Sequence, residues 1–130
     1  MNFGKVKMLA DKDQFSDELF ESVARKPEWV KEFVHRYKGW IKWEDILQHY
    51  KVPEILLEEF ADEFNTVHWN WISGSQKLSE NFIRKHQDEV HWVLISEMQT
   101  LSEDFIAEFR DKVSWPAVSY NQKLSEKFFC

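Results

Sequence analysis

Several classes of protein are excluded by what this sequence has little of. Its one cysteine is Cys130, so no internal disulfide can form, and we expect a reducing, cytoplasmic environment. Three glycines and three prolines leave few residues for the many turns of an all-β fold. No apolar run is long enough for a signal peptide or a membrane span. The sequence therefore predicts a soluble intracellular protein that makes no contact with membranes.

Positive charge is also scarce. The 17 Lys and Arg residues face 23 Asp and Glu residues, which gives a net charge of −6. Direct, general binding of nucleic acid needs a basic face, so we do not expect it. What the sequence has in abundance is aromatic residues, with 7 Trp and 11 Phe among its 130 residues. A single domain of this length can bury a core, and that core should be rich in aromatic rings.

The strongest signal is an internal repeat. The stretch VHWNWISGSQKLSENFIRKHQDEV, which begins at Val67, is followed at once by VHWVLISEMQTLSEDFIAEFRDKV. Equivalent positions are 23 residues apart, and a third, partial copy continues the series through Trp115 and Phe128. A fourth copy lies upstream, where three extra residues, Asn65 to Val67, are expected to lengthen the loop before Trp69. Repetition at one spacing is typical of a repeat array.

Each copy predicts two helices. The half LSEDFIAEFRDKV places its apolar residues at helical spacing up to Val113, and Ser102 can cap its first turn. The half WVLISEMQ predicts a shorter helix that begins at Trp92. Short helices must bury their apolar stripes against neighbours, so we expect an all-α fold in which helix pairs stack as a solenoid-like array.

The predicted organisation is one continuous domain with two kinds of segment. An irregular helical segment comes first, and it includes a helix of its own between Val30 and Lys42. The tandem helical repeats follow. The segments are 1–42 for the irregular part, and 43–68, 69–91, 92–114 and 115–130 for the copies, the last of them partial.

The pattern W-x-x-I-S-x-x-Q-x-L-S-E-x-F-I resembles tandem repeats in uncharacterised proteins of bacteriophages and giant viruses. The resemblance runs from Trp43 to the C-terminus, and the stretch KPEWVKEFVHRYKGW before it does not follow the pattern. It implies an α-repeat fold and a viral or mobile-element origin, and it brings no catalytic residues. By association, it suggests a non-enzymatic protein that occludes a host protein in the host cytoplasm, such as a CRISPR effector or another defence nuclease. A structural or self-assembling repeat protein is the alternative.

Candidate binding residues are those that the repeat does not demand. Trp71 is one, because Leu94 and Ala117 stand at the equivalent positions, and it belongs either to the core or to an interface. The acidic run around Glu58, Glu59 and Asp62 has helical spacing, and it forms either a solvated face or a negative patch for a basic partner.

The end of the sequence offers two more candidates. The third copy stops at Cys130, after Phe128 and Phe129. These two rings either pack back onto the third copy or bind another subunit or a partner, which leaves a homo-oligomer open.

The histidines, serines and glutamines that could suggest metal binding or catalysis are better explained by structural roles. His68 and His91 lie one repeat apart, but no carboxylate or cysteine recurs beside them, so we expect neither a metal nor another cofactor. His86 stands where the next copy has Phe109, which favours a buried histidine. The repeated residues Ser73 and Ser96 suit tight helix packing, and a series that includes Gln76, Gln99 and Gln122 suits hydrogen bonds to loop backbone between copies. We therefore expect no enzymatic activity.

Overall fold

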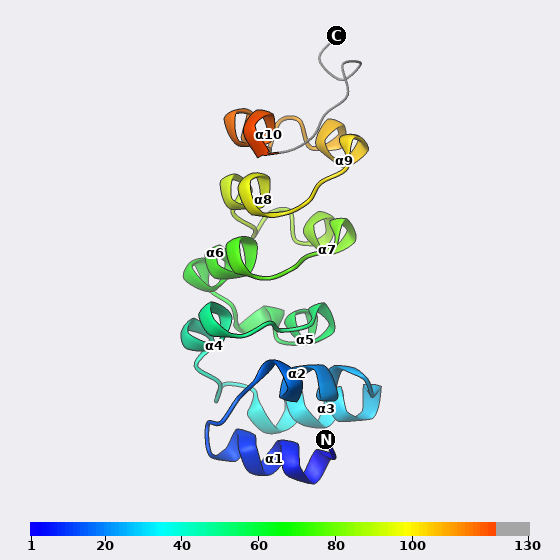
Figure 1. Cartoon of the computed structure of the whole chain (residues 1–130), viewed down its shortest axis with the longest axis vertical. Coiled ribbons are helices and arrows are strands. Elements are labelled where there is room, and N and C mark those ends of the chain that lie inside the picture. The colour runs from blue at the N-terminus through cyan, green and yellow to red at the C-terminus, as the bar shows by residue number, and fades with distance from the viewer. Residues whose placement is uncertain (122–130) are drawn as a thin grey trace. The chain divides into compact units, whose positions relative to one another are not determined.

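All regular secondary structure in residues 1–121, the part of the chain that this computed structural model describes, is helical (Figure 1). This confirms the predicted all-α class. The aromatic core is also present, since Phe20, Phe33, Phe60 and Phe105 are all buried almost completely.

The chain divides into two compact units, Met1–His68 and Trp69–Cys130. The helices that begin in the first unit are α1 (Phe3–Asp11), α2 (Asp17–Ala24), α3 (Pro27–Tyr37), α4 (Trp43–His49), α5 (Glu54–Glu59), the 3₁₀ helix η1 (Ala61–Glu63) and α6 (Thr66–Ser75). All but the first three residues of α6 belong to the second unit. The later helices are α7 (Glu80–Lys85), α8 (Trp92–Met98), α9 (Glu103–Glu108) and α10 (Trp115–Asn121).

The core of the first unit is a cluster of aromatic rings around α3. The ring of Phe33 meets Phe20 of α2 and Phe60 edge-on, with centroids 6.4 and 6.2 Å apart. Phe60 in turn contacts Trp43 of α4 at 4.9 Å. Edge-to-face contacts of this kind add to the stability gained from burying the rings. The cluster explains why so many aromatic residues precede the regular copies.

A polar clamp fixes the end of α1 to α3. The Tyr37 hydroxyl donates to Asp11 Oδ1 at 2.8 Å, and Arg36 Nη2 donates to Asp11 Oδ2 at 2.8 Å. The hydrogen bond from Arg36, followed by the one from Tyr37, lowers the pKa of the Asp11 carboxyl. The sequence predicted a helix between Val30 and Lys42, but α3 begins earlier, at Pro27, which suits a first helical turn, and it ends at Tyr37.

The second unit repeats the same hydrogen bonds at successive copies. The Ser79 and Ser102 hydroxyls each accept the backbone N–H three residues ahead and so cap α7 and α9. The Oγ of Ser73, which is fully buried, accepts the N–H of His91, and the Oγ of Ser96 accepts the N–H of Ser114. These contacts agree with the structural interpretation of the repeated serines.

Gln99 joins two copies from a buried position. Its Nε2 donates to the carbonyls of Ser73 and Gln76, at 2.9 and 2.7 Å, and its Oε1 accepts the N–H of Leu78 at 3.1 Å. One amide side chain thus satisfies three backbone groups that are buried at the end of α6. The sequence predicted this role for the repeated glutamines, and Gln99 confirms it.

Helix lengths differ from the prediction. The second helix of each copy was expected to be the longer one, yet α9 has six residues and α8 has seven. The chain turns after Glu108, where the N–H groups of Lys112 and Val113 both bond to the carbonyl of Phe109. This turn brings Phe109 and Val113 into the core without a longer helix.

The three extra residues before Trp69 lengthen a helix and not a loop. The Asn65 Oδ1 accepts the N–H of His68 at 3.0 Å, and His68 Nδ1 accepts the N–H of Asn65 at 3.2 Å. This reciprocal pair is a capping box with histidine in the place of glutamate. It starts α6 at Thr66, three residues before the repeat tryptophan.

Candidate protein-binding surface

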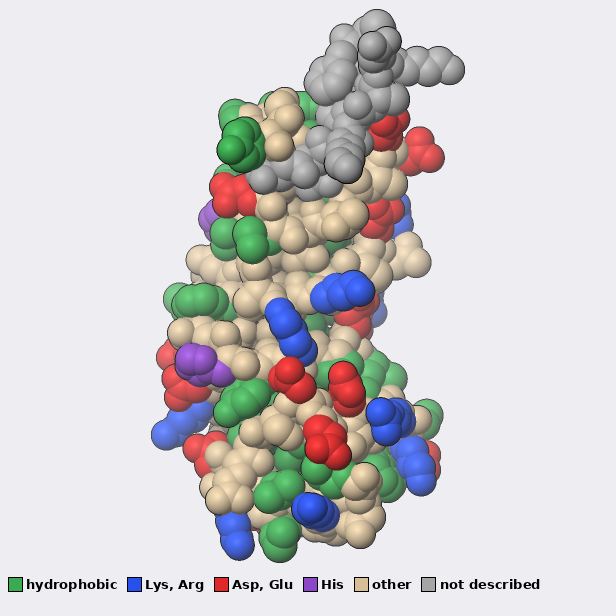
Figure 2. Space-filling view, in the orientation of Figure 1, with side chains coloured by type: hydrophobic (Ala, Val, Ile, Leu, Met, Phe, Trp, Pro, Cys, Tyr) green, Lys and Arg blue, Asp and Glu red, His purple; other side chains and the backbone are tan. Residues whose placement is uncertain are grey.

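The outer side of the first-half helices in the second unit carries almost no charge. Among residues 69–75, 92–98 and 115–121, which α6, α8 and α10 contribute to this unit, Glu97 is the one charged side chain. We call this side the apolar face. Its exposed apolar and aromatic residues are Trp71, Val93, Met98, Trp115, Pro116 and Tyr120. Figure 2 shows hydrophobic side chains and an acidic one over α8 and α10.

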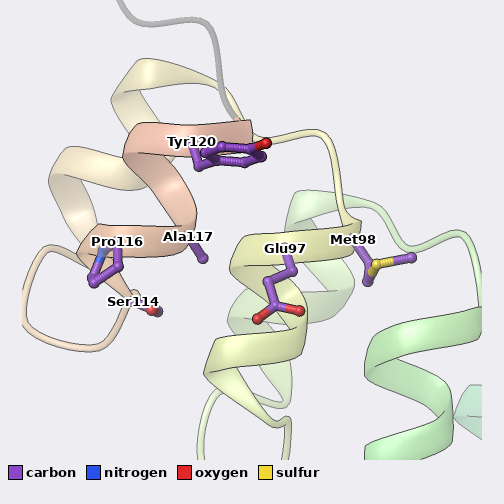
Figure 3. Close-up of a pocket in the computed structure, with 6 residues that line it drawn as sticks. All are labelled: Glu97, Met98, Ser114, Pro116, Ala117 and Tyr120. Atoms are coloured by element: carbon purple, nitrogen blue, oxygen red, sulfur yellow. The ribbon is translucent and has the colours of Figure 1, made fainter.

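A groove between α8 and α10 is part of the apolar face (Figure 3). Its volume is about 390 Å³, and it is lined by Glu97, Met98, Ser114, Pro116, Ala117 and Tyr120. Ala117 points from α10 towards α8, and Glu97 points from α8 towards the gap. The side chains of Met98 and Tyr120 are 60% and 90% exposed.

The corresponding gap between α6 and α8 is filled. Leu94 occupies the position that Ala117 holds one copy later, and it packs against Gly74, which corresponds to Glu97. A Cβ atom added at Gly74 would lie 3.6 Å from the methyl groups of Leu94, an ordinary van der Waals contact. The groove between α8 and α10 is therefore open because alanine replaces leucine there.

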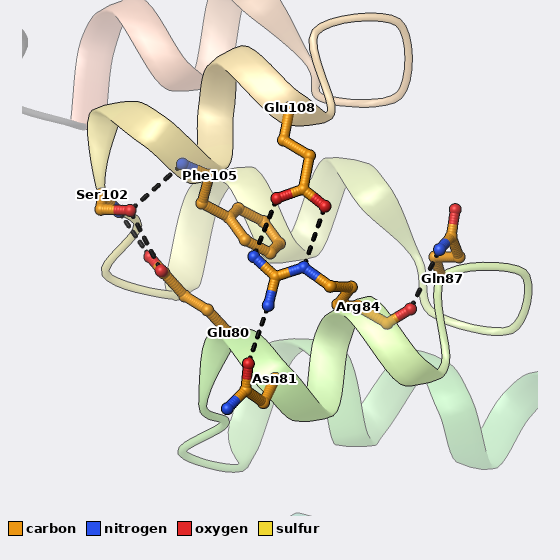
Figure 4. A network of polar contacts seen from close by, with 7 residues as sticks. All are labelled: Glu80, Asn81, Arg84, Gln87, Ser102, Phe105 and Glu108. Atoms are coloured by element: carbon orange, nitrogen blue, oxygen red, sulfur yellow. Dashed lines mark hydrogen bonds and ion pairs between the residues drawn. The ribbon is translucent and has the colours of Figure 1, made fainter.

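The helices α7 and α9 carry the charges that the apolar face lacks, and Figure 4 shows their contacts. Arg84 donates to both carboxylate oxygens of Glu108, at 2.8 and 2.9 Å, and its guanidinium lies 5.6 Å from the Phe105 ring centroid. Glu80 accepts the backbone N–H and the hydroxyl of Ser102. The hydrogen bond from Arg84 lowers the pKa of the Glu108 carboxyl. Arg84 and Glu80 thus bond to residues of the next copy, and these contacts stabilise the junction between copies.

Trp71 is accessible to solvent. It is 38% exposed on α6, whereas Trp69 two residues earlier is buried. The repeat tryptophans were expected to be mostly core, and Trp115 departs from that expectation with 39% exposure. Trp69 and Trp92 each contact a phenylalanine of their own copy, Phe82 and Phe105. In the sequence, the position equivalent to these phenylalanines in the third copy is Phe128, which lies outside the described residues.

Sequence reasoning missed the other exposed members of the apolar face. Met98 and Tyr120 depart from the repeat as Trp71 does, since Ser75 is the counterpart of Met98 and Gly74 that of Tyr120. Both residues could therefore have been found as Trp71 was, because they differ from the residues at equivalent positions in the other copies. Gln99, which follows Met98, is the buried residue at this end of α8.

The acidic candidates do not form one helical face. Glu58 and Glu59 end α5, but Asp62 follows in η1, because the chain leaves the α-helix at Phe60. Asp62 is paired with Lys38 at 2.9 Å, and this hydrogen bond lowers the pKa of the Asp62 carboxyl. Glu58 is half-buried and Glu59 is exposed. Glu59 is thus the member of the group most open to a partner.

The remaining candidates divide into those with a structural role and those that cannot be placed. His91 caps α8 through Nδ1, which accepts the N–H of Leu94, and His86 is buried with its Nδ1 2.7 Å from Glu89 Oε2. Within residues 1–121 no group of three or more His, Cys, Asp or Glu side chains is arranged to hold a metal ion. Phe128 and Phe129 lie outside the described residues.

No helix in the described part of the chain is long and apolar enough to cross a membrane. Comparisons with protein-family models, with curated proteins and with solved structures find no match to this chain.

Proposed function

We propose that this chain is a non-enzymatic helical-repeat protein that binds a second protein and occludes its working surface. In this proposal the copies 43–68, 69–91, 92–114 and 115–130 stack as one solenoid-like array. The repeated serine and glutamine bonds between copies support the array. The serine bond recurs at two successive junctions, and Gln99 adds its bonds at one of them.

The apolar face of the second unit is the observation that carries the binding proposal. Exposed tryptophan, methionine and tyrosine are enriched at protein interfaces, and charged residues are depleted at the centre of such interfaces. Trp71, Met98 and Tyr120 are all exposed on helices of this unit that carry a single charged side chain. A face of this composition marks an interaction site more often than a solvated surface. It offers a flat contact for a protein and no pair of groups for acid–base chemistry.

The acidic residues of the first unit are a second contact in the proposal. Glu59 is exposed on α5, and no hydrogen bond or ion pair engages its side chain within the described residues. Glu58 and Asp62 flank it. The net charge of −6 favours encounter with a basic surface, such as the nucleic-acid-binding groove of a nuclease.

The proposed setting follows from the sequence resemblance. In this proposal the chain, like the phage and giant-virus proteins that its repeat resembles, has a viral or mobile-element origin and acts inside a host cell, so the partner would be a cytoplasmic host protein. A defence nuclease such as a CRISPR effector is the specific form of the proposal, because an acidic protein can compete with nucleic acid for a basic groove.

Affinity capture from bacterial lysate tests this function. The full chain would be immobilised, the lysate treated with nuclease, and bound proteins identified by mass spectrometry. The proposal predicts one nuclease-resistant partner at near-equal stoichiometry. Its recovery should fall with Trp71→Leu, which installs the residue that the next copy carries as Leu94. Met8→Ala, at an exposed position on α1, is the control and should leave recovery unchanged.

Recovery of the bait alone would count against binding to a host protein. In that case sedimentation of the purified chain would decide the matter. A mass that grows with concentration would favour self-assembly, and a constant monomer mass would leave neither function supported.

A further inference from the structure

The groove between α8 and α10 has a chemistry that no other part of the apolar face shares. It is lined by the apolar residues Met98 and Ala117, by Tyr120 and by Glu97. Figure 3 shows Ala117 on α10 and Glu97 on the neighbouring helix α8. Within the described residues, the Glu97 carboxylate makes no hydrogen bond or ion pair. An unpaired anion thus stands beside an apolar slot.

Two departures from the preceding junction create this combination. Leu94 closes the gap between α6 and α8 by packing on Gly74. In the next junction, alanine at 117 leaves the slot empty, and glutamate at 97 supplies a charge where glycine stood. The serine bond across the junction is the same in both, since Ser96 Oγ accepts the N–H of Ser114 as Ser73 Oγ accepts that of His91. The groove is therefore not required by the packing of the helices.

Charge decides what the groove accepts. An occupant without a cation would cover Glu97 and leave a desolvated, unpaired carboxylate, which is costly. An occupant with a cation would make a charge-assisted hydrogen bond to it. Arginine suits the place best, because its guanidinium pairs with a carboxylate in a forked geometry and stacks on rings such as that of Tyr120. Met98 is flexible enough to fit against apolar side chains of different shapes.

We infer that the α8–α10 groove binds a segment of a partner protein in which an apolar side chain lies beside an arginine or lysine. The apolar side chain fills the slot over Ala117, and the cation pairs with Glu97. This inference rests on the proposed function, because it assigns the partner chemistry to one place on the apolar face.

The test is a yeast-displayed library of random twelve-residue peptides, selected on the full chain. The inference predicts enrichment of peptides that place Arg or Lys within one helical turn of Leu, Ile, Met or Phe. Their affinity should fall about tenfold on Ala117→Leu, which fills an apolar slot at the centre of the contact. It should fall about threefold on Glu97→Gln, since an exposed ion pair contributes modestly. Met8→Ala, at an exposed position on α1 in the first unit, is the control and should bind as the unmodified chain does.

Other results would overturn the inference. These are no enriched peptides, enrichment of acidic or uncharged peptides, or equal affinity for the unmodified chain and for both groove variants. Circular dichroism of each variant guards against unfolding, and Glu97→Gln alters only an exposed side chain. Sedimentation that shows a dimer lost on Ala117→Leu would assign the groove to a second copy and would also overturn it.

The same selection separates this inference from the proposed function. Peptides that lose affinity for Trp71→Leu but not for the groove variants would keep the apolar face as a binding surface and refute the groove. Peptides whose affinity is unchanged by all of these variants would refute both the groove and the apolar face as binding surfaces.

Discussion

Comparing the copies 69–91 and 92–114 separates the residues that the fold requires from the residues that can vary. Both contain a buried serine, a capping serine and a buried glutamine at equivalent positions, and Ser73 and Ser96 accept equivalent hydrogen bonds from the next copy. They differ on the outer side of the first helix. There Leu94 is the equivalent of Trp71, and Glu97 is the equivalent of Gly74. The repeated residues thus hold the copies together, and the departures decide what the outer side presents to a partner.

The largest effect in this comparison is expected at Gln99. Gln99→Ala removes three hydrogen bonds and leaves the buried N–H of Leu78 without its acceptor. We expect the free energy of unfolding to fall by about 3 kcal/mol. Urea denaturation followed by circular dichroism measures this change. The neighbouring exposed Thr100→Ala is the control, with a change below about 0.5 kcal/mol.

A smaller and equal effect is expected at the two buried serines. Ser73→Ala and Ser96→Ala each leave one backbone N–H of the next copy without its acceptor, that of His91 or of Ser114. Each should lower the free energy of unfolding by about 1.5 kcal/mol. Denaturation of both variants under one set of conditions gives the comparison. A large effect at one serine and none at the other would show that the two junctions are not equivalent.

The filled and open gaps should respond in opposite ways. Leu94→Ala opens the gap over Gly74 and should cost about 1 kcal/mol, because the side chain is half-buried. Ala117→Leu fills the open groove and should change stability by less than about 0.5 kcal/mol. Thermal unfolding of the pair measures both. Strong destabilisation by Ala117→Leu would contradict our account of why the groove is open.

The smallest effect is electrostatic and depends on pH. Arg84 holds the pKa of Glu108 below its ordinary value of 4.5. The ionised carboxylate therefore stabilises the fold above that value, and this contribution is lost as the pH falls through the lowered pKa. Glu108→Gln should lower the unfolding midpoint at neutral pH and converge with the unmodified chain in acid. Glu97→Gln, which removes no hydrogen bond or ion pair among the described residues, is the control and should leave the unfolding midpoint at neutral pH unchanged.

The periodicity of the sequence was enough to predict the helices and much of the hydrogen bonding between copies. Repeated positions such as those of Ser102 and Gln99 have the same local surroundings in each copy, so one interpretation serves all of them. Helix ends were predicted less well. The turn at Phe109 and the early start of α6 at Thr66 depend on backbone hydrogen bonds and on a histidine–asparagine cap, which hydrophobic spacing does not reveal.

The candidate surface was predicted only in part. Trp71 could be found as a departure from the repeat, and its exposure agrees with an interface role. The groove could not be found in this way, because it depends on two residues that are distant in sequence, Glu97 and Ala117, meeting across two helices. The pairing of Asp62 with Lys38 was likewise invisible to an argument that considered the acidic run alone.

Hydrogen–deuterium exchange of the chain, with and without a captured partner, tests the central claim most directly. The claim is that a partner covers the apolar face of the second unit. It predicts that amides of α8 and α10 exchange more slowly in the complex and that those of α1 are unchanged. Protection confined to the first unit, or to α7 and α9, would contradict it.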